Sequence, residues 1–437
     1  MNKLFFEGQC KRETSDCKSP EQINTSIISE ESQARLSSAE CSLNSIFYQL
    51  IQVSLGTRIC LSHTPSASEW GELYAMAKKQ SLVGVCFAGV QRLQSQKQEP
   101  PEMLYLTWMG MAAKIQQRNE VVNKQCGELT EKFRKDGYDV VVLKGQSAAE
   151  RYKVSEGFIS TSSAQAQGYQ KVSDLSLLRQ SGDIDAWVSG SREEIKKYIT
   201  KNYHVGEVIY NHAHVEVFSD TEVEVHFTPS WLYSPFRNLR LQEWFSNYKV
   251  SDASLVSKGF MFHEDEGFKS PSVEFDLVYL MLHAYRHLMH EGLGLRQVMD
   301  YYMVLRTVSD GFRVSEGFKS VAEFAEVQEV SNTLKSLGLM KFAGAMMYVI
   351  KVVFGFDEMY MICEPNKERG ERLLQEIMRG GNMGRGDDRT GKSKTRVGYF
   401  WEHVSRQWSF MRDYPSEVLW SPLWKIWHFL ARKSGWI

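Results

Sequence analysis

Two aspartates, Asp183 and Asp185, stand two positions apart at the head of an apolar run that extends to Val188. Alternate residues of a strand point to the same face, so this spacing predicts that both carboxylates project together. Carboxylates held side by side repel each other unless a cation lies between them, and Mg²⁺ prefers such oxygen ligands, especially beside substrate phosphates. An Asp-x-Asp triplet alone is common, and two solvated acids at a strand end are the alternative interpretation.

A glycine turn precedes the aspartates. The Val/Leu run at 140–143 predicts a buried strand at 138–143, Gly145 ends it, and Ser147 can open a helix. A strand, a glycine turn and a helix N-terminus together make a phosphate cradle from backbone N–H groups and the helix dipole. The segment is therefore a candidate phosphate-binding loop.

A third acid follows the aspartates. The segment 221–227 alternates polar and apolar residues, which puts Glu222, Glu224 and His226 on one face of a predicted strand. A sheet that brings Glu224 beside Asp183 and Asp185 would complete a metal site of three carboxylates.

These motifs occur in a recognisable order: Leu-Lys-Gly at 143–145, Arg-x-x-Gly-Asp-Ile-Asp at 179–185 and Glu-Val-His at 224–226. The order resembles the DNA polymerase beta-like nucleotidyltransferase superfamily. The chain is most similar to a poorly characterised bacterial branch that is often associated with surface-polysaccharide gene clusters. The sequences at 283–290 and 294–300 resemble that branch's helical signature, so the resemblance extends from about residue 41 to the C-terminus.

The resemblance implies an activity and roles for particular residues. It implies transfer of a nucleoside monophosphate from an NTP to an acceptor, with release of pyrophosphate. Asp183 and Asp185 would hold two Mg²⁺, and Glu224 would complete the metal site and help to activate the acceptor hydroxyl. Lys144 and Arg179 are candidates to neutralise charge on the leaving group. The full nucleotide- and phosphate-binding set is Lys144, Gly145, Gln146, Ser147, Arg179, Ser181 and Gly182. The superfamily's usual Gly-Ser pair is Gly-Gln-Ser here, which weakens the assignment of Ser147.

Histidines and one possible ion pair supply further candidates. His283 and His287 share one helical face with His290, where helix packing is favoured over metal binding. Arg296 and Asp300 can pair along a helix that the resemblance places over the nucleotide. The further site candidates are His226, His283, His287, Arg296 and Asp300. For His212 and His214, a structural or substrate-contact role is favoured over zinc, because only distant acids accompany them in the sequence.

The predicted fold is α+β, with a small mixed-sheet nucleotidyltransferase domain between helical regions. Apolar residues recur at helical spacing from Leu43 to Phe133 and again from Val273. We expect a disordered leader at 1–40, an N-terminal helical region at 41–137, the α/β domain at 138–245 and a C-terminal helical domain at 246–437.

A short motif recurs without a fixed period. Val-Ser-Glu-Gly-Phe occurs at 154–158 and 314–318, with fragments at 256–260 and 266–270. We interpret the copies as insertions into loops, which long surface connections tolerate. The largest, an inserted loop at 154–175, would lie near the mouth of the site and either block or gate it.

Composition bears on the partners, the compartment and the membrane association of the protein. The 437 residues carry a formal net charge of −1, so charge does not indicate a nucleic-acid partner. Seven scattered cysteines form no metal-spaced pair, which predicts reduced thiols and a cytoplasmic location. No run reaches the ~20 apolar residues of a transmembrane span. A tryptophan stripe at Trp420, Trp424 and Trp427 could lie on a membrane surface, although core packing is favoured.

Two other functions remain open at this stage. One is a catalytically inactive nucleotidyltransferase-like protein that binds a nucleotide, and the other is an assembly protein of surface-polysaccharide synthesis. The sequence predicts an NTP and an acceptor as partners. It does not identify the acceptor, the base of the NTP or the oligomeric state.

Overall fold

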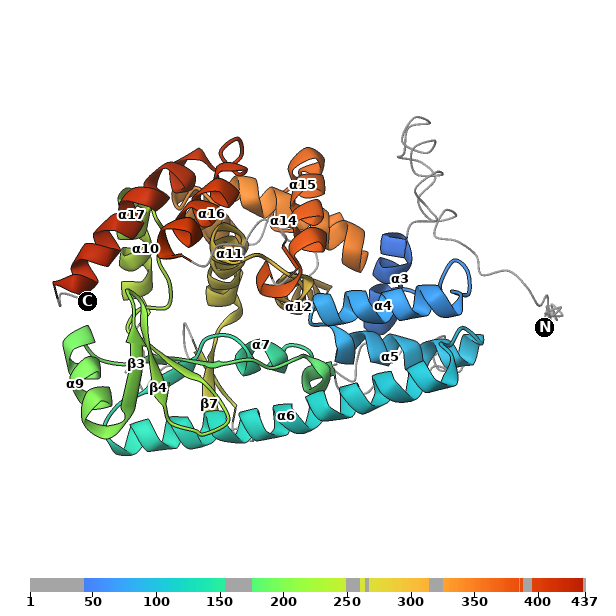
Figure 1. Ribbon diagram of the computed structural model, residues 1–437, viewed down its shortest axis with the longest axis horizontal. Helices are drawn as coiled ribbons and strands as arrows, with labels where there is room; N and C mark the ends of the chain where they lie inside the picture. The colour runs from blue at the N-terminus through green and yellow to red at the C-terminus, as the bar shows by residue number, and fades with distance from the viewer. Residues whose placement is uncertain are drawn as a thin grey trace, which may run out of the picture.

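A computed structural model describes residues 43–153, 175–248, 260–263, 267–313, 325–384, 386–387 and 395–434. Figure 1 shows the sheet at one end, N-terminal helices at the other, and C-terminal helices above both. This arrangement confirms the prediction of an α+β fold with a mixed sheet flanked by helices. The predicted leader, and the inserted loop except for Leu175, lie outside the described residues.

The N-terminal helices form where the apolar periodicity predicts them. They are α3 (Leu43–Leu55), α4 (Ala67–Lys79) and α5 (Val83–Leu93). Helix α4 begins with a capping box, because Ser66 accepts the N–H of Glu69 while Glu69 accepts the N–H of Ser66.

The long helix α6 (Glu102–Lys135) joins the helical region to the sheet along the base of the molecule (Figure 1). Its 34 residues make it about 50 Å long. Trp108 packs into the core of the helical region, and Phe133 packs into the core beneath the sheet. Gly137, with a φ of +87°, ends the helix in a conformation that favours glycine.

The sheet has seven strands in the order β3-β4-β5-β2-β1-β7-β6. Strands β2 and β5 are parallel, as are β1 and β7, and the other neighbours are antiparallel. The strands are β1 (Val140–Val142), β2 (Ile184–Val188), β3 (His204–Val208), β4 (His212–Glu216), β5 (Val223–His226), β6 (Phe260–His263) and β7 (Phe268–Pro271).

The two faces of the sheet differ in chemistry. Ile184, Val223 and their alternates pack in a core with α6 and α9 (Arg192–Asn202). Residues between them in sequence point to the opposite face, where Trp187 packs against Phe275 of α11 (Val273–His290). The polar side chains of β2 and β5 therefore lie on the face that α11 covers.

The described parts of two repeats, Phe260 in β6 and 267–270 at β7, correct the interpretation of these residues as loop insertions. The rest of these two repeats and the copy at 314–318 lie outside the described residues. Phe268 is fully buried in the core beneath the sheet, and β7 pairs with β1. A segment that supplies a strand and a core side chain is part of the fold. The shared Gly-Phe motif hid this role, because four residues are too few to show a periodic pattern.

Phe268→Ala should reduce the free energy of unfolding by about 3–5 kcal/mol, since it removes a fully buried aromatic ring. Met261→Ala on the neighbouring strand is the control, because Met261 is 43% exposed. Urea denaturation of both variants measures the difference. A stability loss at Phe268 no larger than that at Met261 would restore the loop interpretation.

Helices make up most of the remaining chain. Helix α11 packs against α12 (Leu295–Arg313), and a short helix, α7 (Gln146–Glu150), follows β1. The others are α10 (Pro235–Ser246), α13 (Ala325–Ser336), α14 (Met340–Phe354), α15 (Lys367–Gly380), α16 (Arg396–Trp408) and α17 (Pro415–Lys433).

Two further expectations from the sequence concern transmembrane helices and the redox state of the cysteines. Within the described part of the chain, no helix has the length and apolar character needed to cross a bilayer. Cys86 and Cys363 are free thiols, whereas Cys60 is disulfide-bonded. The expectation that all the cysteines are reduced is therefore wrong for Cys60.

Candidate active site

Strand register brings the acidic residues of two strands together. Asp185 on β2 pairs directly with Glu224 on β5, and Glu224 pairs in turn with His214 on β4. His226 lies two positions further along β5, opposite His212. Because alternate residues share a face, these five side chains form one polar cluster on the side of the sheet that faces α11.

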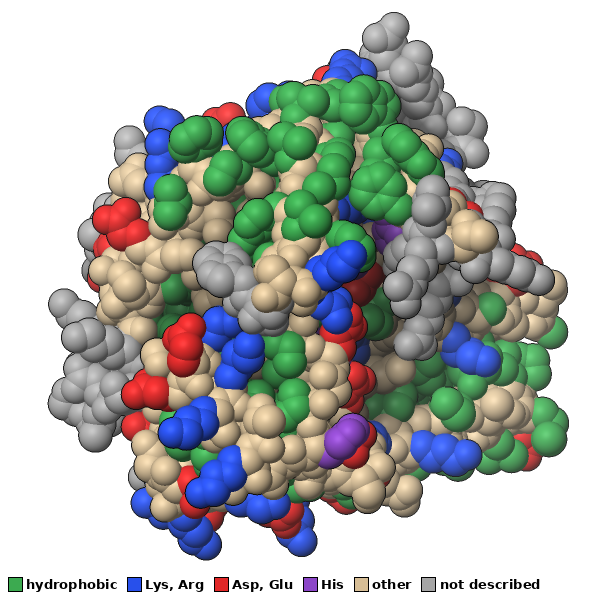
Figure 2. Space-filling view, turned by 60° about the vertical axis from the view of Figure 1, so that its left-hand side comes forward, with side chains coloured by type: hydrophobic (Ala, Val, Ile, Leu, Met, Phe, Trp, Pro, Cys, Tyr) green, Lys and Arg blue, Asp and Glu red, His purple; other side chains and the backbone are tan. Residues whose placement is uncertain are grey.

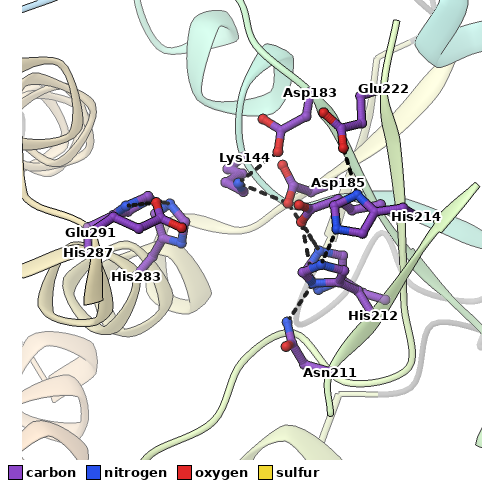
Figure 3. A network of polar contacts seen from close by, with 12 residues as sticks. Lys144, Asp183, Asp185, Asn211, His212, His214, Glu222, His283, His287 and Glu291 are labelled. Carbon is purple, nitrogen blue, oxygen red and sulfur yellow. Dashed lines mark hydrogen bonds and ion pairs between the residues drawn. The ribbon is translucent and has the colours of Figure 1, made fainter. Parts of the chain in front are cut away.

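Lys144 lies between the two aspartates (Figure 3). Its Nζ is 2.9 Å from Oδ1 of Asp185 and 3.6 Å from Oδ2 of Asp183. The N–H of Leu143 donates to the carbonyl of Asp185 over 2.9 Å, which anchors the end of β1 to β2 and so positions Lys144. Lys144 thus occupies the space between carboxylates where a cation was expected.

His226 fastens Asp185 to Glu224. Its Nε2 is 3.0 Å from Oδ1 of Asp185 and 3.3 Å from Oε2 of Glu224. Burial alone would lower the pKa of His226, but the two carboxylates outweigh burial and raise the pKa to about 9. At neutral pH this ring is therefore an imidazolium that donates to both acids.

The charges within the cluster also shift the pKa values of Lys144 and Glu224. Burial would lower the pKa of Lys144, but Asp183, Asp185 and Glu224 raise it well above its usual value. Burial would raise the pKa of Glu224, but the hydrogen bond from His226 and the charge of Lys144 lower it. The cluster therefore consists of the carboxylates of Asp183, Asp185 and Glu224, paired with two positively charged side chains, those of Lys144 and His226.

His212 and His214 extend this cluster. Nδ1 of His212 is 3.4 Å from Oε2 of Glu224, and the Nε2 atoms of the two histidines are 3.4 Å apart. Burial and the neighbouring His226 lower the pKa of His212 to about 2, so its ring is neutral. The acids are distant from these histidines in the sequence only, because the β4–β5 pairing brings Glu224 against both of them.

The donor set fits a divalent cation. Ligand atoms of Asp185, Glu224 and His226 lie within 4.8 Å of one another, as do those of His212, His214 and Glu224. Oδ2 of Asp185 is buried and has no hydrogen-bond partner. A buried carboxylate oxygen without a partner is costly, and a bound cation would satisfy it. Carboxylates suit Mg²⁺, while the nearby imidazoles would also suit Mn²⁺ or Zn²⁺.

The predicted glycine turn is present, although its helix is short. Gly145 has a φ of +65°, and a Cβ there would lie 3.4 Å from the carbonyl oxygen of Asp183. Helix α7 has only five residues, so its dipole contributes less than a long helix would. The Gln146 side chain donates to Asn123 of α6. Ser147 lines a cavity of about 350 Å³ that none of the three carboxylates lines.

A comparison with known protein families places the chain. A family described as uncharacterised nucleotidyltransferase matches residues 66–157 and 168–355. The chain belongs to this family. The matched ranges contain all seven strands and the acidic cluster, and the break at 158–167 falls inside the predicted inserted loop. No curated protein and no solved structure matches the chain.

Arg179 supports the loop that leads to Asp183. Its guanidinium donates to both carboxylate oxygens of Asp300 over 2.7 and 2.8 Å, and the hydroxyl of Tyr152 donates to the same carboxylate. Asn119 of α6 donates to the carbonyls of Leu177 and Arg179. The charge of Arg179 is therefore matched inside the protein, and its role in this structure is to position the loop.

Arg296 is the cation next to that loop, and it does not form the predicted pair with Asp300. Its Nη1 donates to the carbonyl of Gln180 over 3.0 Å and would lie 3.8 Å from a Cβ at Gly182. Its Nε is buried without a partner. Among the described residues no ion pair joins Arg296 to a carboxylate, so its charge is available for a ligand at the loop 180–182.

Helix α11 forms the opposite wall of the candidate site. Figure 3 shows His283 and His287 across from Lys144. Their Nε2 atoms are 2.9 Å apart, and Nδ1 of His287 is 3.4 Å from Oε2 of Glu291. Burial and the neighbouring His287 lower the pKa of His283, which is neutral. The two histidines form a hydrogen bond with each other along α11, and both face the acidic cluster.

Proposed function

We propose that this protein transfers a nucleoside monophosphate from an NTP to an acceptor hydroxyl and releases pyrophosphate. One observation carries the proposal: Asp183 and Asp185 both lie within 3.6 Å of Nζ of Lys144, Asp185 pairs with Glu224 across the two strands, and one oxygen of Asp185 has no hydrogen-bond partner. Membership of a nucleotidyltransferase family supports the same reaction class.

Asp183, Asp185 and Glu224 would hold divalent cations, with two Mg²⁺ expected. When bound, these ions would neutralise phosphate charge and make the acceptor hydroxyl more acidic. His226 orients Asp185 and Glu224 by donating to both. Such outer hydrogen bonds commonly fix the direction of metal ligands.

The triphosphate would lie between the two turns of the site. Arg296 supplies positive charge at the loop 180–182, Lys144 supplies it at the aspartates that follow, and Arg179 holds the loop in place. The backbone at Gly145, Ser181 and Gly182 can approach phosphate closely, since Gly182 is exposed and glycine has no side chain. Arg296 thus takes the role in charge neutralisation that the sequence analysis gave to Arg179.

Lys144→Met should strengthen metal binding by the nucleotide-free protein by about tenfold or more while reducing transfer. A unit charge ~4 Å from a cation costs several kcal/mol at an effective dielectric constant of ~20, so removing Lys144 favours an incoming ion. Titration calorimetry with MnCl₂ measures this change. Lys153→Met is the control, since Lys153 pairs with Glu150 outside the cluster. Weaker binding of Mn²⁺ by Lys144→Met would place the metal elsewhere.

The function is tested by a screen for acceptors. NTPs labelled at the α-phosphate are incubated with the full chain, MgCl₂ or MnCl₂, and a cell extract. The proposal predicts a labelled product of one size class and matching release of pyrophosphate. Label found only as free monophosphate would indicate hydrolysis instead of transfer.

An inactive nucleotide-binding protein is the second candidate. It is favoured by the pairing of Oδ1 of Asp185 with both Lys144 and His226, which stabilises the cluster without a metal. Nucleotide binding without any turnover in the screen would support it, and a lack of nucleotide binding would favour an assembly role. A cytoplasmic location, the DNA polymerase beta-like superfamily and a part in surface-polysaccharide synthesis stay predictions.

A further inference from the structure

Helix α17 exposes a broad apolar stripe to solvent. The large side chains on this stripe are each at least 38% exposed: Leu419, Leu423, Ile426, Trp427, Phe429 and Leu430. The side chains packed inward include the smaller Val418, Ser421 and Ala431. Trp420 and Trp424 also pack inward against the core. The exposed face nevertheless carries a row of large apolar side chains, where an ordinary surface helix is polar. The favoured core packing of the tryptophan stripe holds for Trp420 and Trp424, whereas Trp427 is 38% exposed.

Neighbouring helices enlarge the apolar surface. Phe236 and Leu239 of α10 are 67% and 69% exposed, and the ring of Phe236 lies 6.2 Å from that of Trp420. Helix α16, which packs against α17, adds the exposed Trp401 and Trp408. Figure 2 shows hydrophobic side chains gathered across the upper part of this side of the molecule. Contiguous apolar surface of this extent marks an interaction site.

Charge on α17 is basic where it meets solvent. Lys433 is exposed at the end of the helix, and Arg432 beside it also pairs with Glu207. The one acid of the helix, Glu417, is 1% exposed and accepts the N–H groups of Tyr233 and Ser234. An apolar stripe of Trp, Phe and Leu with basic residues and no exposed acid complements an anionic lipid surface.

The shape of the surface favours a bilayer over a protein segment. The exposed residues recur at spacings of three and four along α17 and continue onto α10 and α16 through Phe236, Leu239 and Trp401. The apolar surface thus spans three helices and is not confined to the width of one bound helix. An open hollow of about 590 Å³ at the C-terminal end of α17 is lined by Trp427, Leu430 and Lys433 among others. Its apolar wall and ammonium group match the two parts of an anionic lipid.

We propose that α17, with the exposed residues of α10 and α16, seats the protein peripherally on an anionic membrane surface. The ring of Tyr210 lies 6.2 Å from that of Trp424 and 6.1 Å from that of Trp427, and Tyr210 precedes Asn211 and His212 in the chain. A docked bilayer would therefore lie beside the acidic cluster and bring lipid-borne acceptors near it. The binding itself does not depend on the proposed catalytic function.

Co-sedimentation of the full chain with vesicles tests this inference. Vesicles of phosphatidylcholine with phosphatidylglycerol are compared with vesicles of phosphatidylcholine alone. The wild type should bind the anionic vesicles. The double variant Leu423→Glu with Ile426→Glu should bind them at least about tenfold more weakly, because it puts charge on the apolar face that would enter the bilayer. Lys433→Glu should weaken binding only to the anionic vesicles.

A matched control introduces the same charge elsewhere. Met103 and Leu106 of α6 are 76% and 46% exposed, and the double glutamate variant at these positions should bind vesicles like the wild type. Absence of wild-type binding, or equal losses in both double variants, would overturn the inference. If gel filtration instead shows an oligomer that only the α17 variant dissociates, the surface is a protein interface and the membrane proposal is wrong.

Discussion

Asp185→Asn should abolish metal-dependent binding of NTP and reduce nucleotidyl transfer by about three orders of magnitude or more. Asparagine keeps the shape of the side chain but removes the charge that attracts a divalent cation. The fully buried Asp185 is, within the described part of the chain, the one acid that forms ion pairs with both Lys144 and His226. Asp183→Asn should act in the same direction, because Asp183 shares Lys144 with it.

Asp139→Asn is the matched control for this prediction, since Asp139 lies at the other end of β1 and pairs with Lys269. Calorimetric titration with a non-hydrolysable NTP analogue, with and without MgCl₂, measures binding. Thermal unfolding is measured in parallel, because loss of Asp185 leaves two cations partly uncompensated in the interior. If Asp185→Asn folds and still binds metal and nucleotide like the wild type, the acidic cluster has no part in the mechanism.

Glu224→Gln and Glu222→Gln should give opposite outcomes, although the two residues share one face of a strand. Glu224 is 15% exposed at its side chain and lies opposite Asp185, whereas Glu222 is 64% exposed and pairs with His214 over 2.7 Å. Loss of the Glu224 charge should reduce transfer by several orders of magnitude, because the third acid positions the cation that activates the acceptor. Glu222→Gln should change neither binding nor transfer appreciably.

The Glu224→Gln and Glu222→Gln variants also distinguish an effect on catalysis from an effect on nucleotide binding. The aspartates alone can hold the metal that accompanies the NTP, so Glu224→Gln should bind the NTP–metal complex with little change. Calorimetry and pyrophosphate release, measured on both variants, give the two quantities separately. Full activity in Glu224→Gln would exclude it as the third ligand, and loss of activity in Glu222→Gln instead would move the assignment to that residue.

Much of the site could be predicted because it lies within single strands. The spacing of Asp183 and Asp185, and the alternation around Glu224, are local properties that strand geometry turns into a shared face. The positive φ of Gly145 likewise follows from a glycine that ends an apolar run. Apolar periodicity predicted the helices of the N-terminal region for the same reason.

Partners from distant segments could not be predicted in this way. Nothing in the local sequence shows that His212 lies against Glu224, since this depends on the register of β4 on β5. The spacing of Arg296 and Asp300 suggested a pair, but Arg179 reaches Asp300 from the loop before β2 with better bidentate geometry. The stripe on α17 shows the same limit, because periodicity reveals an apolar face and not what covers it.

Transfer of label from an NTP labelled at the α-phosphate, catalysed by the wild type and by Asp185→Asn in the same cell extract, tests the central claim most directly. The acidic cluster is predicted to give a labelled acceptor and pyrophosphate only with the wild type and only while Mg²⁺ or Mn²⁺ is present. Equal labelling by Asp185→Asn, or labelling by the wild type that persists in excess chelator, would contradict a metal-dependent nucleotidyltransferase site at Asp183, Asp185 and Glu224.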